Sequence, residues 1–145
     1  MPIVSVTRLH VRAWRFLPAF ILASYRSARQ ARHSGSFLTG CLAVEPPAGF
    51  WTVTVWENEA AMRSFRNSGV HLETMPKLLN WCDEASYVHW TTDATSLPTV
   101  AEAHRRLAEQ GKLSKVTHPS AAQQAGTCAP GGPPRPSQLL TPLTR

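Results

Sequence analysis

The stretch FWTVTVWENEAAMRSFRNSGVH, residues 50–71, decides the fold of this chain because it runs from a strand straight into a helix. Up to Trp56, apolar residues alternate with their neighbours at the two-residue period of a pleated strand. Beyond Trp56 the apolar period becomes helical, and Asn58 is a suitable N-cap. Gly69 is expected to end or bend this helix, so that rigid elements place His71.

Length and charge limit the class of protein. The chain has 145 residues, enough for one domain with a real core. It carries 15 Lys plus Arg against nine Asp plus Glu, an excess that nucleic acid or an anionic ligand would match. The excess is spread evenly, and no block of five or six like charges occurs. We therefore expect solvated basic faces, and a nucleic-acid partner is the least favoured interpretation.

Cysteine usage and apolar runs bear on the compartment. Cys41, Cys82 and Cys128 are odd in number and form no metal-binding spacing, which favours reduced thiols, no metal site and a cytoplasmic protein. The apolar run at residues 16–23 is too short to cross a bilayer and is interrupted by Pro18. We therefore expect no membrane partner.

The predicted elements follow the order βαββαβ. This order within about 90 residues is the ferredoxin-like α+β arrangement, an antiparallel four-stranded sheet with two helices on one face. The second helix is expected to continue in a helical piece that Pro76 kinks or begins. The strands are expected at residues 3–12, 37–45, 50–56 and 85–90, and the helical segments at 18–32, 58–68 and 70–81.

The second face of the sheet needs a cover of its own. Both rows of the strand at residues 37–45 are apolar, with Leu38 and Leu42 on one side and Cys41 and Ala43 on the other. Two helices cover one face only, so we expect a second copy of the chain to cover the other in a two-fold homodimer.

Three parts are expected along the chain. Residues 1–91 form the ferredoxin-like domain. Residues 92–118 form an extension with one extra helix, which Thr99 caps and which packs outside the barrel or across the pocket mouth. Residues 119–145 contain six prolines, which predicts a disordered tail without a catalytic part.

Several segments resemble a known family. The strand ending in Trp56-Glu57, the helix ENEAAMRSF and the NSGVH that follows resemble the dimeric α+β barrel family, in particular its antibiotic-biosynthesis-monooxygenase-like members. The segments VTRLHVRAWRFLP, MPKLLNWCDEAS and PTVAEAHRRLAEQGKLSKV are similar to a branch near spheroidene monooxygenase. The resemblance covers residues 1–90 and reaches more weakly to Pro119. It implies a dimeric α+β barrel and oxygenation of an aromatic or polyene metabolite.

The same resemblance implies a catalytic role for His71, which falls where the cofactor-free members commonly have a histidine. There it would take a proton from an electron-rich phenol, which then reacts with oxygen. In haem-degrading relatives the ligand histidine lies one turn further on, where this chain has Met75. We therefore expect no cofactor, with haem held by His71 as an alternative. His71 could also be a helix-start residue without chemistry.

Two groups of charged side chains also stand out. Arg8 and His10 share a strand face with Arg12 and could bind a substrate carboxylate or phenolate, or could form the exposed end of that strand. Asp83 and Glu84 are adjacent residues that cannot converge on one point, so they are interpreted as the turn into the last strand.

The remaining substrate-binding candidates are aromatic or lie beside His71. Trp51 and Trp56 could form pocket walls for a flat ligand or fill the core. Asn67 and Ser68 could orient His71 or a substrate oxygen, or simply end the helix.

The sequence thus predicts a small monooxygenase-like enzyme that acts on an aromatic or polyene metabolite, with His71 as base. The alternative is a non-catalytic dimer of the same fold that binds a small hydrophobic or aromatic metabolite. A basic nucleic-acid-associated protein is the third interpretation.

Overall fold

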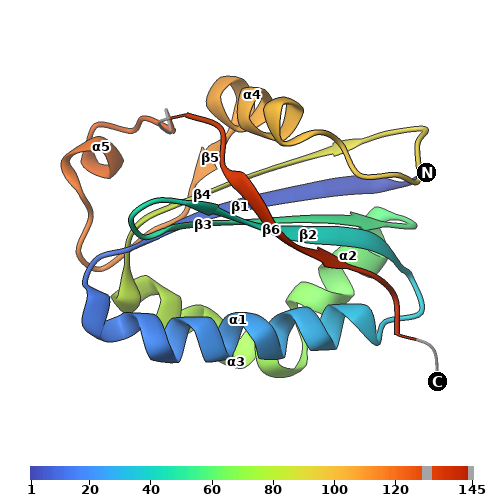
Figure 1. Cartoon of the computed structure of the whole chain (residues 1–145), viewed down its shortest axis with the longest axis horizontal. Helices are drawn as coiled ribbons and strands as arrows, with labels where there is room; N and C mark the ends of the chain where they lie inside the picture. The colour runs from blue at the N-terminus through green and yellow to red at the C-terminus, as the bar shows by residue number, and fades with distance from the viewer. Residues whose placement is uncertain (129–131, 144–145) are drawn as a thin grey trace.

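A computed structural model describes residues 1–128 and 132–143 and confirms the predicted α+β fold. A twisted antiparallel sheet crosses the molecule, with helices on both sides of it (Figure 1). A short 3-10 turn, η1 (Trp14–Phe16), precedes the first helix. The predicted elements are β1 (Ile3–Val11), α1 (Leu17–Arg32), β2 (Phe37–Glu45), β3 (Gly49–Trp56), α2 (Glu59–Arg66), α3 (Gly69–Trp81) and β4 (Cys82–Thr91).

The sheet has six strands in the order β5-β4-β1-β3-β2-β6. The four inner strands are the predicted ones, and β5 (Lys112–Leu113) and β6 (Arg135–Leu140) extend the two edges. In the register of the central strands, Arg8 on β1 lies opposite Trp51 on β3 and Ser86 on β4. Alternate residues of a strand face opposite sides, so this register fixes which side chains share a face.

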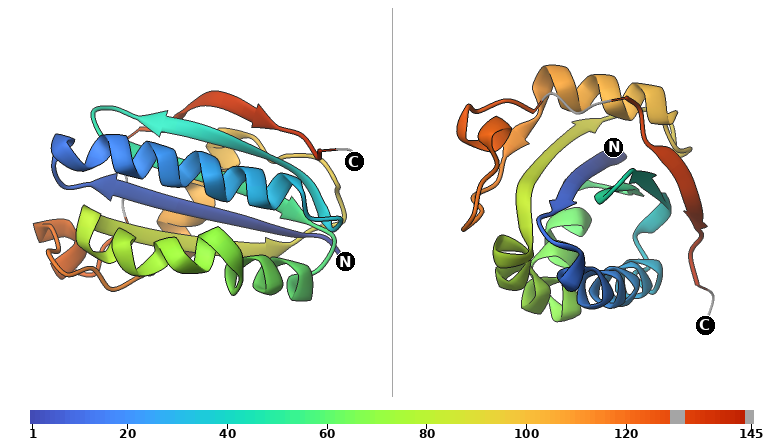
Figure 2. Two further views of the ribbon diagram at one scale, coloured as in Figure 1. Left: turned by 90° about the horizontal axis from the view of Figure 1, so that it is seen from below. Right: turned by 60° about the vertical axis from the view of Figure 1, so that its left-hand side comes forward.

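One face of the sheet packs against α1, α2 and α3. Trp56 is fully buried there and contacts Phe37 and Phe65, with ring centroids 5.4 and 5.0 Å apart. Its indole Nε1 donates to Thr54 Oγ1 at 2.9 Å. This tryptophan is therefore a core residue, which was one of its two predicted roles. α1 and α3 lie side by side as the outer layer (Figure 2).

The other face is covered by α4 (Val100–Gln110), which Thr99 caps by accepting a hydrogen bond from the Glu102 N–H. Ala103 and Leu107 of α4 are buried in one cluster with sheet residues from β1, β2, β3 and β4. The extra helix therefore packs directly on the face that the sequence analysis assigned to a second copy. The homodimer remains a prediction, but an uncovered apolar sheet face no longer supports it.

The C-terminal region corrects the expectation of a disordered tail. Residues 135–140 form β6, which pairs with β2 and buries Leu140. Pro136 is tolerated because it lies on an edge strand, where one row of backbone groups has no ladder partner. Beyond the strand, the Leu143 N–H donates to the Arg32 carbonyl at 2.9 Å. The proline content of the tail gave no indication of these backbone hydrogen bonds. Residues 129–131 and 144–145 of the predicted tail lie outside the described residues.

The junction between α2 and α3 differs in detail from the prediction. Gly69 begins α3 instead of ending α2, and its φ of +59° is a left-handed conformation that glycine adopts at low cost. α3 runs without interruption through Pro76, which lies on its exposed side, where water can reach the backbone group that the ring leaves unpaired. No helix in the described residues is both long and apolar enough to cross a bilayer.

Candidate functional site

The sheet separates the predicted site residues into two groups. Arg8, His10 and Trp51 lie on the α4 face, because they share the strand rows of Val4 and Val6, which pack under α4. Trp56, Asn67, Ser68 and His71 lie on the helix side of the sheet. The two groups cannot line one site, since the sheet itself stands between them.

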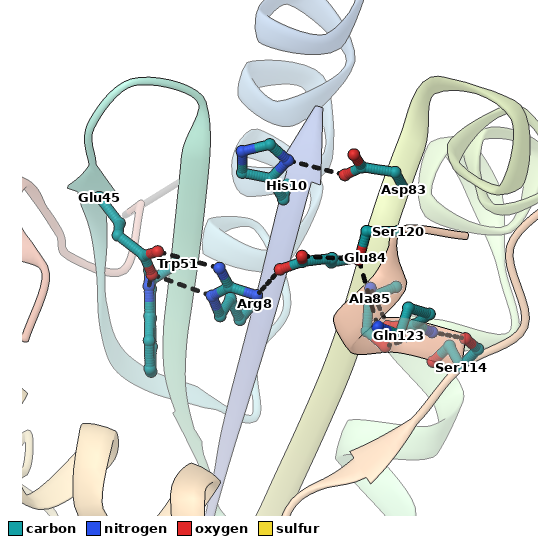
Figure 3. Close-up of polar contacts among 10 residues, drawn as sticks. All are labelled: Arg8, His10, Glu45, Trp51, Asp83, Glu84, Ala85, Ser114, Ser120 and Gln123. Atoms are coloured by element: carbon teal, nitrogen blue, oxygen red, sulfur yellow. Dashed lines mark hydrogen bonds and ion pairs between the residues drawn. The ribbon is translucent and has the colours of Figure 1, made fainter. Parts of the chain in front are cut away.

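On the α4 face, Arg8 lies between two carboxylates (Figure 3). Its Nε and Nη2 donate to the two oxygens of Glu45, both at 2.9 Å, and its Nη1 donates to Glu84 Oε1 at 2.7 Å. The Trp51 indole also donates to Glu45, at 2.9 Å, and Ser120 Oγ donates to Glu84 Oε2 at 2.7 Å. The guanidinium thus binds the carboxylates of its own chain in the geometry expected for binding a substrate anion.

The electrostatics of this group follow from its burial. Burial alone would lower the pKa of Arg8, but the hydrogen bonds to Glu45 and Glu84 outweigh it and raise the pKa above its usual value. The hydrogen bond from Arg8 lowers the pKa of Glu45. Burial opposes the shift at Glu84, where the hydrogen bonds from Arg8 and Ser120 still lower the pKa. All three groups are therefore charged at neutral pH and neutralise one another in part.

His10 and a segment near the C-terminus complete this cluster. His10 Nδ1 lies 2.7 Å from Asp83 Oδ1, and Figure 3 shows the other ring nitrogen pointing away from Asp83. Gln123 of α5 (Ala121–Gln124) accepts from the Ala85 N–H at 3.3 Å and donates to the Ala85 carbonyl at 3.4 Å, as a neighbouring strand would. These contacts hold residues 120–124 against β4 beside Arg8.

The structure therefore corrects two interpretations of these charges. Arg8 is only 8% exposed, so it is not the exposed end of a strand. Glu84, interpreted as a turn residue, is a direct partner of Arg8, and Glu45 was missed as its second partner. Glu45 ends β2 and Glu84 lies near the start of β4, so both were visible as charged residues close to strand ends, but the strand order was needed to place them beside Arg8.

On the helix side, the start of α3 places His71. Its backbone N–H donates to Gln30 Oε1 of α1 at 2.9 Å, and its ring packs on Phe65, with ring centroids 4.7 Å apart. His71 Nδ1 lies 3.3 Å from the Arg66 carbonyl oxygen. A carbonyl can only accept, so this contact places the ring proton on Nδ1 and leaves the lone pair on Nε2. Burial lowers the pKa of His71, so the imidazole is neutral at neutral pH.

A polar pocket of about 270 Å³ lies between α1 and α2, and His71 does not line it but contacts two residues that do. Gln30 and Phe65, which hold the His71 backbone and ring, both line it. Ser68 also lines it and donates its hydroxyl to the Ser64 carbonyl at 2.7 Å, whereas Asn67 is an exposed residue at the end of α2. The pocket is lined by Gln30, His33, Ser34, Ser36, Ala61, Ser64, Phe65 and Ser68.

A second hollow, of about 430 Å³, lies between the start of α4 and β6. Leu97, Val100, Pro136 and Leu139 make most of its wall apolar, and Cys41 also lines it. Burial raises the pKa of the Cys41 thiol, so this thiol stays protonated at neutral pH. The hollow suits an apolar group better than a charged one.

Metal and haem binding find little support in the side chains present. In the part of the chain that the structure describes, no three His, Cys, Asp or Glu residues gather as metal ligands would. Haem-binding relatives hold the macrocycle between helices and sheet, but Trp56, Met62 and Phe65 fill that space here. Met75, at the position of the relatives' ligand histidine, is 39% exposed. The residues present do not fit haem.

The fold is that of the antibiotic-biosynthesis-monooxygenase-like α+β barrel proteins. SnoaB, a cofactor-independent oxygenase from Streptomyces nogalater, is 20% identical, with a TM-score of 0.53 over 68% of this chain and 98% of SnoaB. Rv0793 from Mycobacterium tuberculosis is 12% identical, with a TM-score of 0.60 over 66% of this chain and all of Rv0793 (100%). An antibiotic biosynthesis monooxygenase is 12% identical, with a TM-score of 0.57, over 63% of this chain and 99% of its own. At such identities the likeness establishes the fold alone.

The chain belongs to the family described as a domain of unknown function, DUF3291, whose family model matches residues 18–116. That range begins at α1 and includes β2 to β4 and α4. No curated protein matches the sequence.

Proposed function

We propose that this protein is a small monooxygenase-like enzyme that oxygenates an electron-rich aromatic metabolite without a cofactor, with His71 as the general base. The observation that carries the proposal is the placement of the His71 imidazole by Phe65 and Gln30, two residues that also line the adjacent pocket. The fold shared with SnoaB, a cofactor-independent oxygenase, supports the same reaction class.

The proposed proton transfer uses Nε2, because Nδ1 already donates to the Arg66 carbonyl. Nε2 would take the proton of a phenol or of an activated methylene beside it, which leaves an electron-rich anion. The anion gives electrons to O₂ and combines with it. Loss of water then converts the methylene to a carbonyl, so that one oxygen atom enters the product and the other leaves as water. The substrate supplies every electron, so the step needs no external reductant.

The lining of the pocket suits a hydroxylated aromatic substrate. Phe65 offers an aromatic face for a flat ring. Ser64 and His33 supply a hydroxyl and an imidazole that can hydrogen-bond to phenol or carbonyl oxygens, and the Ser68 hydroxyl, which donates to the Ser64 carbonyl, can accept from a phenol. At about 270 Å³ the pocket favours a compact ring system.

Oxygen uptake on a panel of hydroxyanthrones and naphthols tests the proposal. We expect turnover by the purified protein without added metal or flavin, and a loss of kcat on the order of a hundredfold in His71→Ala and His71→Gln. His118→Ala is the matched control, because it removes an exposed histidine between β5 and α5 and should leave the rate unchanged. Equal rates in His71→Ala and the native chain would exclude His71 as the base.

The apolar hollow between α4 and β6 favours a second candidate function, the binding of a hydrophobic metabolite without chemistry. The resemblance to the branch near spheroidene monooxygenase extends the ligand class to polyenes. Saturable binding of a polyene, weakened by Leu97→Asp at the hollow and accompanied by no oxygen uptake on any compound, would support this alternative.

A further inference from the structure

The exposed apolar side chains of this protein gather on one layer. Nine large apolar side chains are exposed in the described residues, and seven of them lie on η1, α1 and α3. Trp14 is 83% exposed, Leu22 60% and Tyr25 54%, values that leave most of each side chain in water. The seven are Trp14, Ile21, Leu22, Tyr25, Leu72, Met75 and Leu79.

These residues share the outer side of the helix layer. Leu22 and Tyr25 recur at helical spacing with Arg29, and Leu72 and Leu79 lie two turns apart on α3. The opposite sides of both helices hold their buried residues, Phe20 and Thr74 among them. Because α1 and α3 lie side by side (Figure 2), their outer sides form one broad face, which we call the α1–α3 face.

The α1–α3 face is also basic. Residues 12–32 contain five arginines and no Asp or Glu, so one segment holds a third of the Lys and Arg of the chain. Arg26 and Arg29 are exposed and form no ion pair within the described residues. α3 adds one acidic residue, Glu73, and one basic residue, Lys77.

We propose that the α1–α3 face docks on an anionic lipid surface. An exposed tryptophan and tyrosine, leucines and unpaired arginines on one face match the chemistry of an interfacial helix. The leucines and rings would enter the boundary of the acyl chains while Arg26 and Arg29 meet anionic headgroups. A peripheral contact of this kind needs no spanning helix, so it revises only the expectation that the protein has no membrane partner.

A second copy of the chain matches this face less well. A two-fold contact through α1 would bring Arg26 and Arg29 towards the same arginines of the other copy, with no acidic residue on α1 to offset them. Desolvating like charges against each other opposes association, whereas an anionic surface attracts them. This inference is independent of the proposed function, because it uses neither His71 nor the pocket.

Co-sedimentation with vesicles of phosphatidylcholine, with and without phosphatidylserine, tests the proposal on the full chain. We expect binding that requires phosphatidylserine and weakens with added salt. The pair Arg26→Gln and Arg29→Gln should lower the partition coefficient on the order of tenfold, since each basic residue near the surface contributes independently. The pair Leu22→Ser and Tyr25→Ser should lower it by a similar factor, because it removes buried apolar area.

Matched controls lie elsewhere on the surface. Lys112→Gln with Lys115→Gln removes the same charge from exposed sites at and beyond β5, and Leu139→Ser removes a 62% exposed leucine from β6. Neither should change binding by more than about twofold. Circular dichroism and thermal unfolding check that each variant is folded, which we expect because the substituted positions are exposed.

Three outcomes would overturn the proposal. The first is no binding to phosphatidylserine vesicles at low salt. The second is equal loss of binding in the Lys112 and Lys115 control, which would reduce the effect to net charge. The third is a dimer in light scattering that Leu22→Ser with Tyr25→Ser dissociates, which would assign the face to a second copy.

Discussion

The two faces of the sheet are covered by different means and use their polar groups differently. On the α4 face, Arg8, Glu45 and Glu84 bind one another, and Trp51 and Ser120 complete their hydrogen bonds. On the helix face, His71 Nδ1 contacts the Arg66 carbonyl, and Gln30 and Phe65, which contact His71, line a pocket. A group of charged side chains is therefore a poor guide to function when its members satisfy one another. A single neutral base beside a hollow carries the stronger functional claim.

Breaking the Arg8 cluster should have the largest effect on folding. Arg8→Leu leaves Glu45 and Glu84 largely buried without their partner and should lower the free energy of unfolding by about 3–5 kcal/mol. Urea unfolding at neutral pH measures this loss. Arg12→Leu removes hydrogen bonds to Asn80 at a more exposed site and should cost about 1 kcal/mol. Equal losses in the two variants would show that Arg8 is not the centre of this face.

Removing the α4 anchor comes next. Leu107→Ala truncates a side chain with 0% exposure in the cluster under α4 and should cost about 2–4 kcal/mol. Leu139→Ala, at a 62% exposed position on β6, should change stability by less than about 0.5 kcal/mol. Analytical ultracentrifugation of both variants and the native chain also tests the predicted homodimer. Self-association that appears only in Leu107→Ala would indicate that α4 shields a surface able to bind a second copy.

Acid should lower the stability of the protein by protonating Glu45 and Glu84 on the α4 face, before the packing of the helix face is affected. The folded-state pKa values of Glu45 and Glu84 are lowered, so their contribution is complete above the unfolded value of about 4.3 and is lost as pH falls below it. We expect a loss on the order of 1–2 kcal/mol across this window. In Arg8→Leu the trend should vanish or reverse, because protonation then relieves two buried charges. Urea unfolding between neutral pH and the acid range measures both slopes.

Gly69 tests the helix face with the smallest expected change in stability. Gly69→Ala forces a left-handed residue with its Cβ 3.0 Å from Gln30 Oε1, at a cost of about 1–2 kcal/mol. Gln30 also accepts the hydrogen bond from the His71 N–H, so displacing Gln30 should also lower the rate of oxygen uptake. Gly35→Ala has no atom within 4 Å of the new Cβ and should be nearly neutral in thermal unfolding and in rate. An unchanged rate in a folded Gly69→Ala protein would show that activity does not depend on how Gln30 places His71.

The inner four strands and three helical segments could be predicted from the sequence because their signals are local. The two-residue period before Trp56 and the helical period after it are visible within a few residues. The cap at Asn58 is local too, and its side chain accepts from the Ala61 N–H at 2.8 Å as expected. The added strand β6 was missed because its evidence is a backbone ladder to β2 and not a pattern in its own residues.

The candidate site divides along the same line. His71 could be singled out from its place after a helix break, and the structure adds the contacts of its ring to Phe65 and Arg66. The roles of Arg8 and Trp51 could not be decided from the sequence. They depended on which row of side chains on each strand faces α4. Glu45 lies 37 residues from Arg8 in sequence and Glu84 lies 76 residues away.

The sequence by itself determined the strand–helix unit at residues 50–71 and, with it, the α+β class, since backbone periods and caps depend on neighbours in the chain. The tertiary structure alone decided that α4 covers the second face of the sheet and that Trp56 belongs to the core. It also decided that Arg8 donates its hydrogen bonds to carboxylates of its own chain. These outcomes depend on strand order and register, which bring distant residues into contact and which no local pattern encodes.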